Sequence, residues 1–136
     1  MIDAAWEERV LPALSEYTRI PCLSPAFDPD WAERGFIAQA AELLLAWVRD
    51  QEPALQAEIV ELRDRTPVIL IDNGGAGDPI VIYGHMDKQP PLGEWRDGLG
   101  PYEPVRDGDL LYGRGTADDG YATFAAVTAL LAANVA

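Results

Sequence analysis

The spacing of apolar residues changes once along this chain, near Pro53, and the change limits the elements that the chain can form. Before Pro53, apolar residues recur at three- and four-residue intervals, which is typical of amphipathic helices. After Pro53, short runs rich in valine and isoleucine alternate with glycine- and proline-rich connections, which is typical of strands and turns. The sequence therefore predicts an α/β fold in which a mixed β-sheet is flanked by helices.

Two helices are predicted before Pro53, and a third near the end of the sequence. The first covers residues 3–19, where apolar side chains gather on one face, and it ends before Pro21. The second begins at a cap-like acid followed by a proline and covers residues 28–50. The third follows Asp119, is apolar at most positions and is therefore expected to be buried.

Four strands are predicted after Pro53. They cover residues 57–62, 67–71, 79–83 and 109–112. The second and third are apolar at nearly every position, so we expect them to be central strands covered on both faces of the sheet. A turn-rich connection at residues 72–78 joins these two strands, which are therefore also expected to form a hairpin.

Composition limits the size of the fold and the partners of the protein. The chain has 136 residues, of which 49% are hydrophobic, enough for one domain with a sizeable core. Its formal net charge is −13, which excludes nucleic acid and anionic membranes as partners, because both attract clusters of lysine and arginine. The acidic excess either keeps the protein soluble or partly surrounds a cation site, where carboxylates repel one another until metal binds.

The sequence also indicates a cellular compartment. No run approaches the roughly 20 apolar residues that span a membrane, and the first residues lack the order of a signal peptide. The only cysteine, Cys22, has no partner for an intramolecular disulfide and is expected to be a small buried side chain. We therefore expect a cytoplasmic protein.

The only histidine of the chain, His85, belongs to the sequence Gly-His-Met-Asp at residues 84–87, directly after the predicted strand at residues 79–83. Side chains two positions apart on a strand point to the same side, so His85 and Asp87 are expected to lie together. An imidazole that binds a metal usually passes its second N–H to a carboxylate. The pair therefore suits a metal ligand with its orienting acid, whereas a lone histidine is more often an ordinary hydrogen-bonded residue.

A glycine-rich turn at residues 113–120 brings two adjacent carboxylates, Asp118 and Asp119, to the start of the third predicted helix. Taken together with His85 and Asp87, these acids favour a metal site. Each acid also has a local alternative. Asp118 and Asp119 are both suited to capping the helix, and Asp87 is suited to capping a turn.

Two other ligand classes fit the residues poorly. The order strand, glycine turn, helix is superficially that of a phosphate-binding loop, but the turn lacks the Gly-Lys-Ser/Thr ending, and its two carboxylates would occupy the place of the phosphate. Calcium is disfavoured, because neither residues 72–78 nor residues 107–118 place oxygen ligands at the alternating positions of a calcium loop.

The motifs taken together resemble those of a known family. The series is Gly84-His-Met-Asp-Lys-Gln-Pro90, then Trp95, Gly100-Pro-Tyr102, and Asp107-Gly-Asp-Leu-Leu-Tyr-Gly-Arg-Gly-Thr-Ala-Asp-Asp119. It is similar to the first half of the di-zinc metallopeptidase and deacylase family, which includes aminoacylase, carnosinase-type dipeptidases, acetylornithine deacetylase, succinyl-diaminopimelate desuccinylase and glutamate carboxypeptidases. Residues 20–24 also resemble the proline-serine segment after the first helix of that family, so the resemblance covers essentially the whole chain.

The resemblance implies a role for each site residue. His85 corresponds to a zinc ligand, Asp87 to the catalytic residue that orients it, and Asp118 to the carboxylate that bridges two zinc ions. Cobalt and manganese are possible substitutes for zinc. The peptide bond between Asp118 and Asp119 is typically cis in the family. Lys88 replaces a small apolar residue of the family pattern close to the site, a departure that removes no ligand but leaves the choice of substrate open.

The resemblance also implies residues that this chain does not supply. Family members take a catalytic glutamate, a glutamate ligand, a further acid and a second histidine from downstream positions, and none of these can be assigned after Asp119. A catalytic zinc generally needs three protein ligands. We therefore expect residues 1–136 to be the N-terminal portion of a zinc-hydrolase catalytic domain that is inactive alone.

The expected function of the complete enzyme is zinc-dependent hydrolysis of a peptide or N-acyl amide bond, with a dipeptide or an N-acyl amino acid as substrate. The alternative is a non-catalytic module that associates with itself. Because an incomplete sheet leaves an unpaired edge and exposed apolar surface, we expect a homo-oligomer.

Overall fold

The computed structural model describes residues 2–133 of the chain, which combine helices with small antiparallel sheets. The helical elements are α1 (Ile2–Ala5), the π-helical η1 (Trp6–Val10), α2 (Leu11–Arg19), α3 (Trp31–Arg34), α4 (Phe36–Gln51) and α5 (Ala122–Ala132). The strands are β1 (Gln56–Val60), β2 (Val68–Asp72), β3 (Val105–Asp107) and β4 (Leu110–Tyr112). The predicted mixture of helices and strands is therefore confirmed.

The three predicted helices are present. The helix predicted at residues 3–19 is formed by α1, η1 and α2, which follow one another without a break. The helix predicted at residues 28–50 is divided into α3 and α4 by Gly35, whose φ of 70° lies in the left-handed region that glycine adopts readily. The third predicted helix is α5, and it begins three residues after Asp119.

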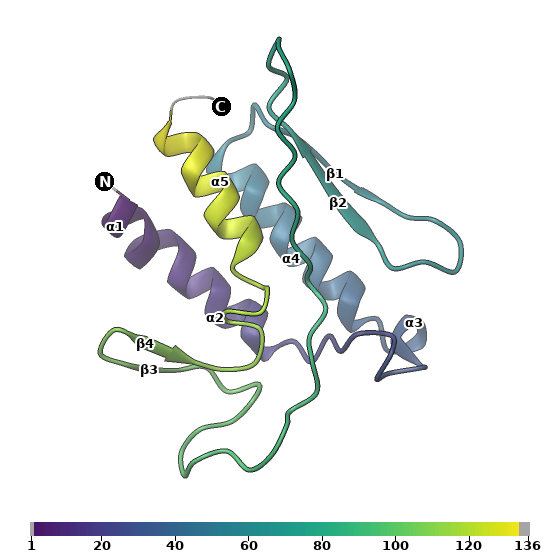
Figure 1. Cartoon of the computed structure of the whole chain (residues 1–136), viewed down its shortest axis with the longest axis vertical. Coiled ribbons are helices and arrows are strands. Elements are labelled where there is room, and N and C mark those ends of the chain that lie inside the picture. Colours follow the sequence, from purple (N-terminus) through teal and green to yellow (C-terminus); the bar gives the residue numbers. More distant parts are fainter. Residues whose placement is uncertain (1, 134–136) are drawn as a thin grey trace.

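The hydrophobic core lies where α4 packs against α2 and α5 (Figure 1). Its buried side chains come from the helices and from the segment that follows α2: Val10, Leu14, Tyr17, Ile20, Cys22, Ile37, Ala40, Leu44 and Phe124. The rings of Trp47 and Phe124 meet edge to face, with their centroids 4.7 Å apart, and this contact joins α4 to α5. The expected burial of Cys22 is confirmed.

The strands of the described residues form two separate sheets of two strands each. In the first, β1 pairs antiparallel with β2, and Val60 lies opposite Val68. In the second, β3 pairs antiparallel with β4, and Val105 lies opposite Tyr112. The strand predicted at residues 67–71 is therefore present as β2, but the hairpin expected between it and the following run is wrong, because β2 pairs with β1 instead.

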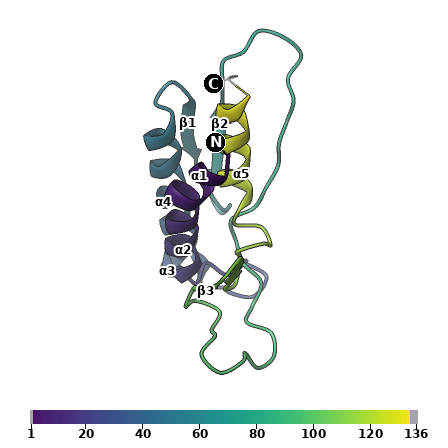
Figure 2. The same cartoon turned by 90° about the vertical axis from the view of Figure 1, so that its left-hand side faces the viewer.

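The strand predicted at residues 79–83 is wrong. This segment has no regular structure, and Figure 2 shows the chain between β2 and the site arching away from the helices. Ile80 and Val81 are 91% and 86% exposed. The central position expected for β2 is also wrong, because Val68 and Leu70 are exposed. A β-branched run becomes a central strand only when other strands pair with it on both sides, and residues 2–133 supply none beside residues 79–83.

None of the helices in the described part of the chain is both long enough and apolar enough to cross a bilayer.

Candidate metal site

Two irregular segments, residues 84–88 and 113–121, meet at the start of α5. Gly84 permits their close approach, because a Cβ at this position would lie 2.5 Å from the Cβ of Ala122 and 3.1 Å from Asp119 Oδ2. The backbone N–H of the next residue, His85, donates a hydrogen bond of 3.3 Å to Asp119 Oδ2. Glycine at position 84 therefore allows the histidine segment to lie directly against the acidic turn.

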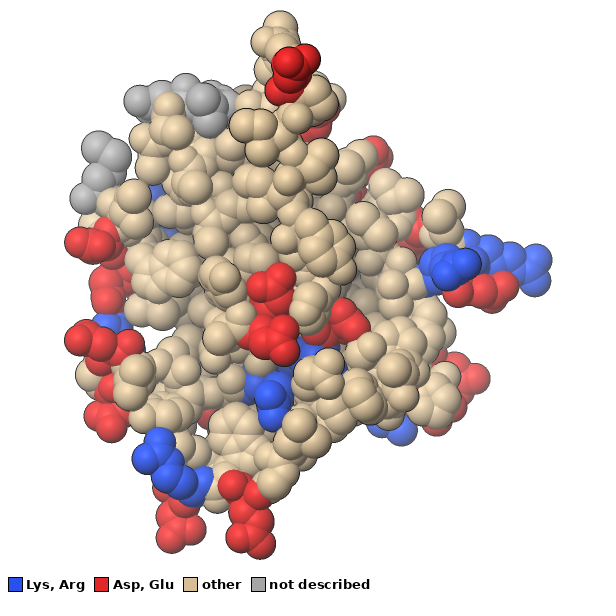
Figure 3. Space-filling view, viewed as in Figure 1, with Lys and Arg blue, Asp and Glu red and all other residues tan. Residues whose placement is uncertain are grey.

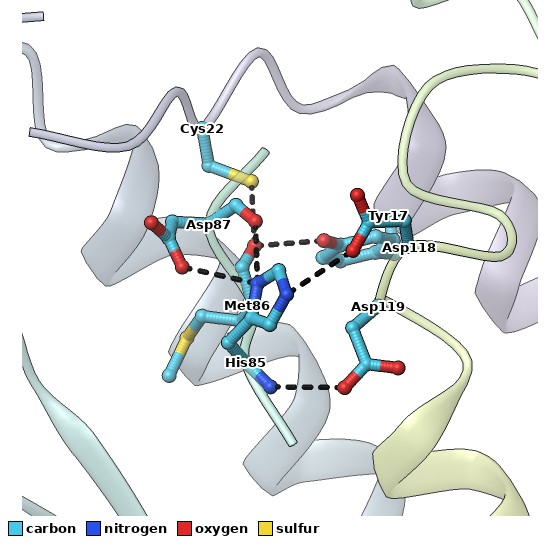
Figure 4. A network of polar contacts seen from close by, with 7 residues as sticks. All are labelled: Tyr17, Cys22, His85, Met86, Asp87, Asp118 and Asp119. Carbon is cyan, nitrogen blue, oxygen red and sulfur yellow. Dashed lines mark hydrogen bonds and ion pairs between the residues drawn. The ribbon is translucent and has the colours of Figure 1, made fainter. Parts of the chain in front are cut away.

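The imidazole of His85 lies between two carboxylates (Figure 4). Its Nδ1 atom is 3.2 Å from Asp87 Oδ1 and 3.0 Å from the backbone carbonyl oxygen of Asp87. Its Nε2 atom is 3.2 Å from Asp118 Oδ1. The structure thus brings His85, Asp87 and Asp118 together, and Asp118, with 66% of its side chain exposed, is the member of this group most open to solvent.

The acids around His85 raise its proton affinity. Burial lowers the pKa of the imidazole, but the hydrogen bond to the Asp87 carbonyl and the negative charges of Asp87, Asp118 and Asp119 raise it. The net result is a pKa above the ordinary value of histidine. The same negative charges that favour a proton on the ring also favour a metal cation beside it.

The two adjacent acids do not cap α5. The N-cap residue of this helix is Tyr121, and no side chain makes a capping hydrogen bond there. The Asp119 carboxylate instead accepts the backbone N–H of His85, and the Asp118 carboxylate faces the ring. The peptide bond between Asp118 and Asp119 is cis, as the resemblance implies.

The acidic excess of the chain is only partly associated with this site. Figure 3 shows most acidic side chains of one face along its rim, with a smaller acidic group beside basic side chains near the middle. On this face, therefore, only a minor share of the acidic side chains lies in the middle group.

Two neutral donors behind the histidine were not recognised as site residues from the sequence. The hydroxyl of Tyr17 and the thiol of Cys22 both donate to the Met86 carbonyl, at 2.7 Å and 3.2 Å. Burial raises the pKa of Tyr17 and of Cys22, so both side chains stay protonated at neutral pH. No local pattern indicates these contacts, since Tyr17 fits the apolar face of its helix and Cys22 fits the core.

Lys88, the residue that departs from the family pattern beside the site, points into the protein interior. The side chain is fully buried, and its Nζ atom donates to the carbonyl oxygens of Tyr17, Thr18 and Ile20. Burial lowers the pKa of Lys88 to about 8, so the ammonium is still charged at pH 7. All of its donors are committed to backbone oxygens, so none is free for a substrate.

The donor atoms of the site fit zinc in type but not in number. Imidazole nitrogen and carboxylate oxygen are common zinc ligands, and His85 and Asp118 supply one of each. Within residues 2–133, however, no group of three or more histidine, cysteine, aspartate or glutamate side chains is arranged to hold a metal ion. A catalytic zinc generally has three protein ligands, so further ligands would have to come from elsewhere.

A histidine with a carboxylate beside each ring nitrogen is compatible with a metal site, because an imidazole that binds a metal usually passes its second N–H to a carboxylate. Residues 81–135 match the model of peptidase family M20/M25/M40. The match covers the part of the chain that carries both segments of the site, and the resemblance seen in the motifs is confirmed there. The metal-binding roles of His85 and Asp118 remain a prediction.

Proposed function

We propose that this chain supplies the first part of the site of a zinc-dependent hydrolase that cleaves peptide or N-acyl amide bonds. The observation that carries the proposal is the His85 ring, which has a carboxylate oxygen 3.2 Å from each of its two nitrogens. The match to a peptidase family supports hydrolysis as the reaction. His85 and Asp118 are the proposed ligands, and Asp87 is the proposed orienting residue.

The residues of this chain would prepare the site for the metal. Asp87 accepts a hydrogen bond from the Nδ1–H group and so holds the tautomer whose Nε2 lone pair points toward Asp118. Asp118 supplies negative charge on the side of the ring where a cation would bind, and the resemblance gives it a bridging role between two ions. Zinc, when bound, acts as a Lewis acid that activates water and polarises a carbonyl group. Cobalt or manganese would serve as substitutes.

The proposed substrates are dipeptides or N-acyl amino acids, on the strength of the motif resemblance. The ligand count at His85 and Asp118 supports the further proposal that residues 1–136 are the N-terminal portion of the catalytic domain. A proton-transferring glutamate and the missing ligands would then be supplied by a later segment. A cytoplasmic location belongs to the same proposal.

We expect the 136-residue chain alone to hydrolyse neither dipeptides nor N-acyl amino acids at a measurable rate, because it lacks these ligands and the proton-transferring residue. A protein expressed from the coding sequence extended past codon 136 is expected to hydrolyse at least one of them. Chelator should remove that activity and added zinc should restore it. Efficient turnover by the 136-residue chain, or hydrolysis insensitive to chelator, would contradict the proposal. A stop codon directly after codon 136 would favour the non-catalytic alternative.

One observation favours self-association, the other candidate function. Four consecutive large apolar side chains, those of residues 80–83, are exposed. Contiguous apolar surface of this kind is typical of sites that another chain covers, and we propose that a second copy does so. Light scattering should then show a dimer or larger assembly, whereas the variant Val81→Lys, altered at a position with no packing to lose, should be a monomer. A monodisperse monomer of the unsubstituted chain at high concentration would contradict this.

A further inference from the structure

The only lysine of the chain, Lys88, is fully buried and directly follows Asp87. Its ammonium donates to the carbonyl oxygens of Tyr17 at 2.9 Å, Thr18 at 3.0 Å and Ile20 at 2.7 Å. An ammonium has three N–H donors, so every one of them is used. The acceptors belong to the last turn of α2 and to its C-cap residue, where the helix dipole also favours a cation.

The backbone around Lys88 is hydrogen-bonded to the same region, α2 and the segment that follows it. The Lys88 N–H donates to the Cys22 carbonyl at 2.8 Å, and the Lys88 carbonyl accepts the Ser24 N–H at 2.9 Å. Two residues earlier, the Met86 carbonyl accepts the Tyr17 hydroxyl. Residues 86–88 are therefore attached to α2 and to residues 20–24 through both backbone and side chains.

Lys88 also touches the segment that carries the second proposed ligand. A Cβ on Gly115 would lie 2.7 Å from Lys88 Cε, so the lysine stem packs directly against the turn three residues before Asp118. On its other side, the Nζ atom lies 4.2 Å from the centroid of the Tyr17 ring. One side chain of the histidine segment thus contacts both helix α2 and the acidic turn.

Anchoring of this kind matters because the histidine segment receives no support from the residues that precede it. Residues 79–83, which precede it, are exposed and pair with no strand in the described part of the chain. The position of His85 is therefore fixed from two sides, by its N–H bond to Asp119 Oδ2 and by the attachment of residues 86–88. Metal sites require donor atoms held to within about 0.5 Å, which an unanchored loop does not provide.

We infer that Lys88 is a positioning residue of the candidate metal site, which holds His85 and Asp87 at a fixed place relative to Asp118. The inference rests on the proposed function, because it assigns a purpose to the geometry of the proposed ligands. Lys88 touches neither the metal nor the substrate in this role. It acts through the segment that carries the histidine.

The test compares two variants of the 136-residue chain. Lys88→Met removes the ammonium but keeps an unbranched side chain of similar bulk. Val48→Ala is the matched control, because it removes buried packing from a second core cluster, formed with Leu55 and Val127, that contains no residue of the site. Circular dichroism and denaturant unfolding establish that each variant is folded. The readouts are the NMR signals of the His85 ring, unambiguous because the chain has a single histidine, and Zn²⁺ affinity by calorimetry.

In folded Lys88→Met, the His85 ring signals should shift and the affinity for Zn²⁺ should fall about tenfold or more, as for other residues that orient metal ligands. Val48→Ala should lower stability and leave both readouts unchanged. Unchanged ring signals and unchanged Zn²⁺ affinity in folded Lys88→Met would overturn the inference.

Two further outcomes are also decisive. If the unsubstituted chain binds no Zn²⁺, the proposed function fails, but the His85 signals still test the positioning role without metal. If Lys88→Met does not fold, Lys88→Gln takes its place, since glutamine keeps two N–H donors. Failure of both variants to fold would overturn the positioning role and show that Lys88 serves the fold as a whole.

Discussion

Replacing Asp118 with alanine should lower the hydrolytic activity of the complete enzyme by about a thousandfold or more, equivalent to about 4 kcal/mol in the barrier. The reason is electrostatic. Asp118 Oδ1 is the carboxylate oxygen that faces His85 Nε2, at 3.2 Å, so it supplies the negative charge on the side where the metal is proposed to bind. Without it, two cations would face each other with less charge between them. The measurement is kcat/KM, with the metal content of the purified protein determined in parallel.

The control for this substitution is Asp109→Ala. Asp109 is an exposed acid in the turn between β3 and β4, so its replacement removes the same charge without touching the site. This variant should keep its activity and its metal. Full activity in Asp118→Ala, or an equal loss in both variants, would show that Asp118 has no specific role.

Gly120→Ala should destabilise the fold by about 3 kcal/mol, at the upper end of the usual cost of overpacking. Gly120 is buried, and a Cβ there would overlap both the ring of Tyr17 and the carbonyl oxygen of Gly115. Neither neighbour is free to move. Tyr17 is fully buried and bonded to the Met86 carbonyl, and Gly115 accepts the N–H of Gly120 itself.

Urea unfolding measures this effect as a lower midpoint with an unchanged slope. Gly75→Ala is the matched control, because the nearest atoms to its added Cβ belong to the Asn73 side chain at 3.5 Å, an ordinary contact. Its free energy of unfolding should stay within about 0.5 kcal/mol of the unsubstituted chain. A Gly120→Ala variant as stable as Gly75→Ala would mean that Tyr17 is held less firmly than the contacts indicate.

The sequence predicted the helices well because their signals are local. Apolar side chains at residues 3–19 repeat every three or four positions whatever lies elsewhere in the chain. A strand depends on a partner that the local pattern does not contain. Residues 79–83 have the composition of a buried strand, yet they are exposed, because no described strand lies beside them. Only an explicit account of strand pairing could have revealed this.

The candidate site was likewise predicted only where its features are local in the sequence. His85 and Asp87 are two positions apart, so their proximity follows from the local chain, and the glycine turn that carries Asp118 was recognised as a motif. The contacts that hold these residues in place were not predicted. The bond from Lys88 Nζ to the Tyr17 carbonyl joins residues 71 positions apart. In its local sequence, Lys88 looks like an ordinary charged residue, and Tyr17 looks like an ordinary core residue of a helix.

A zinc titration of the unsubstituted chain, followed through the NMR signals of the His85 ring, decides whether this residue is a metal ligand. Binding at Nε2 should move the signal of that nitrogen as zinc is added, while Nδ1 keeps the proton that it shares with Asp87. Asp118→Ala should weaken the response. Ring signals that do not change in excess zinc would show that the histidine binds no metal in this chain, and the proposed ligand set would be wrong.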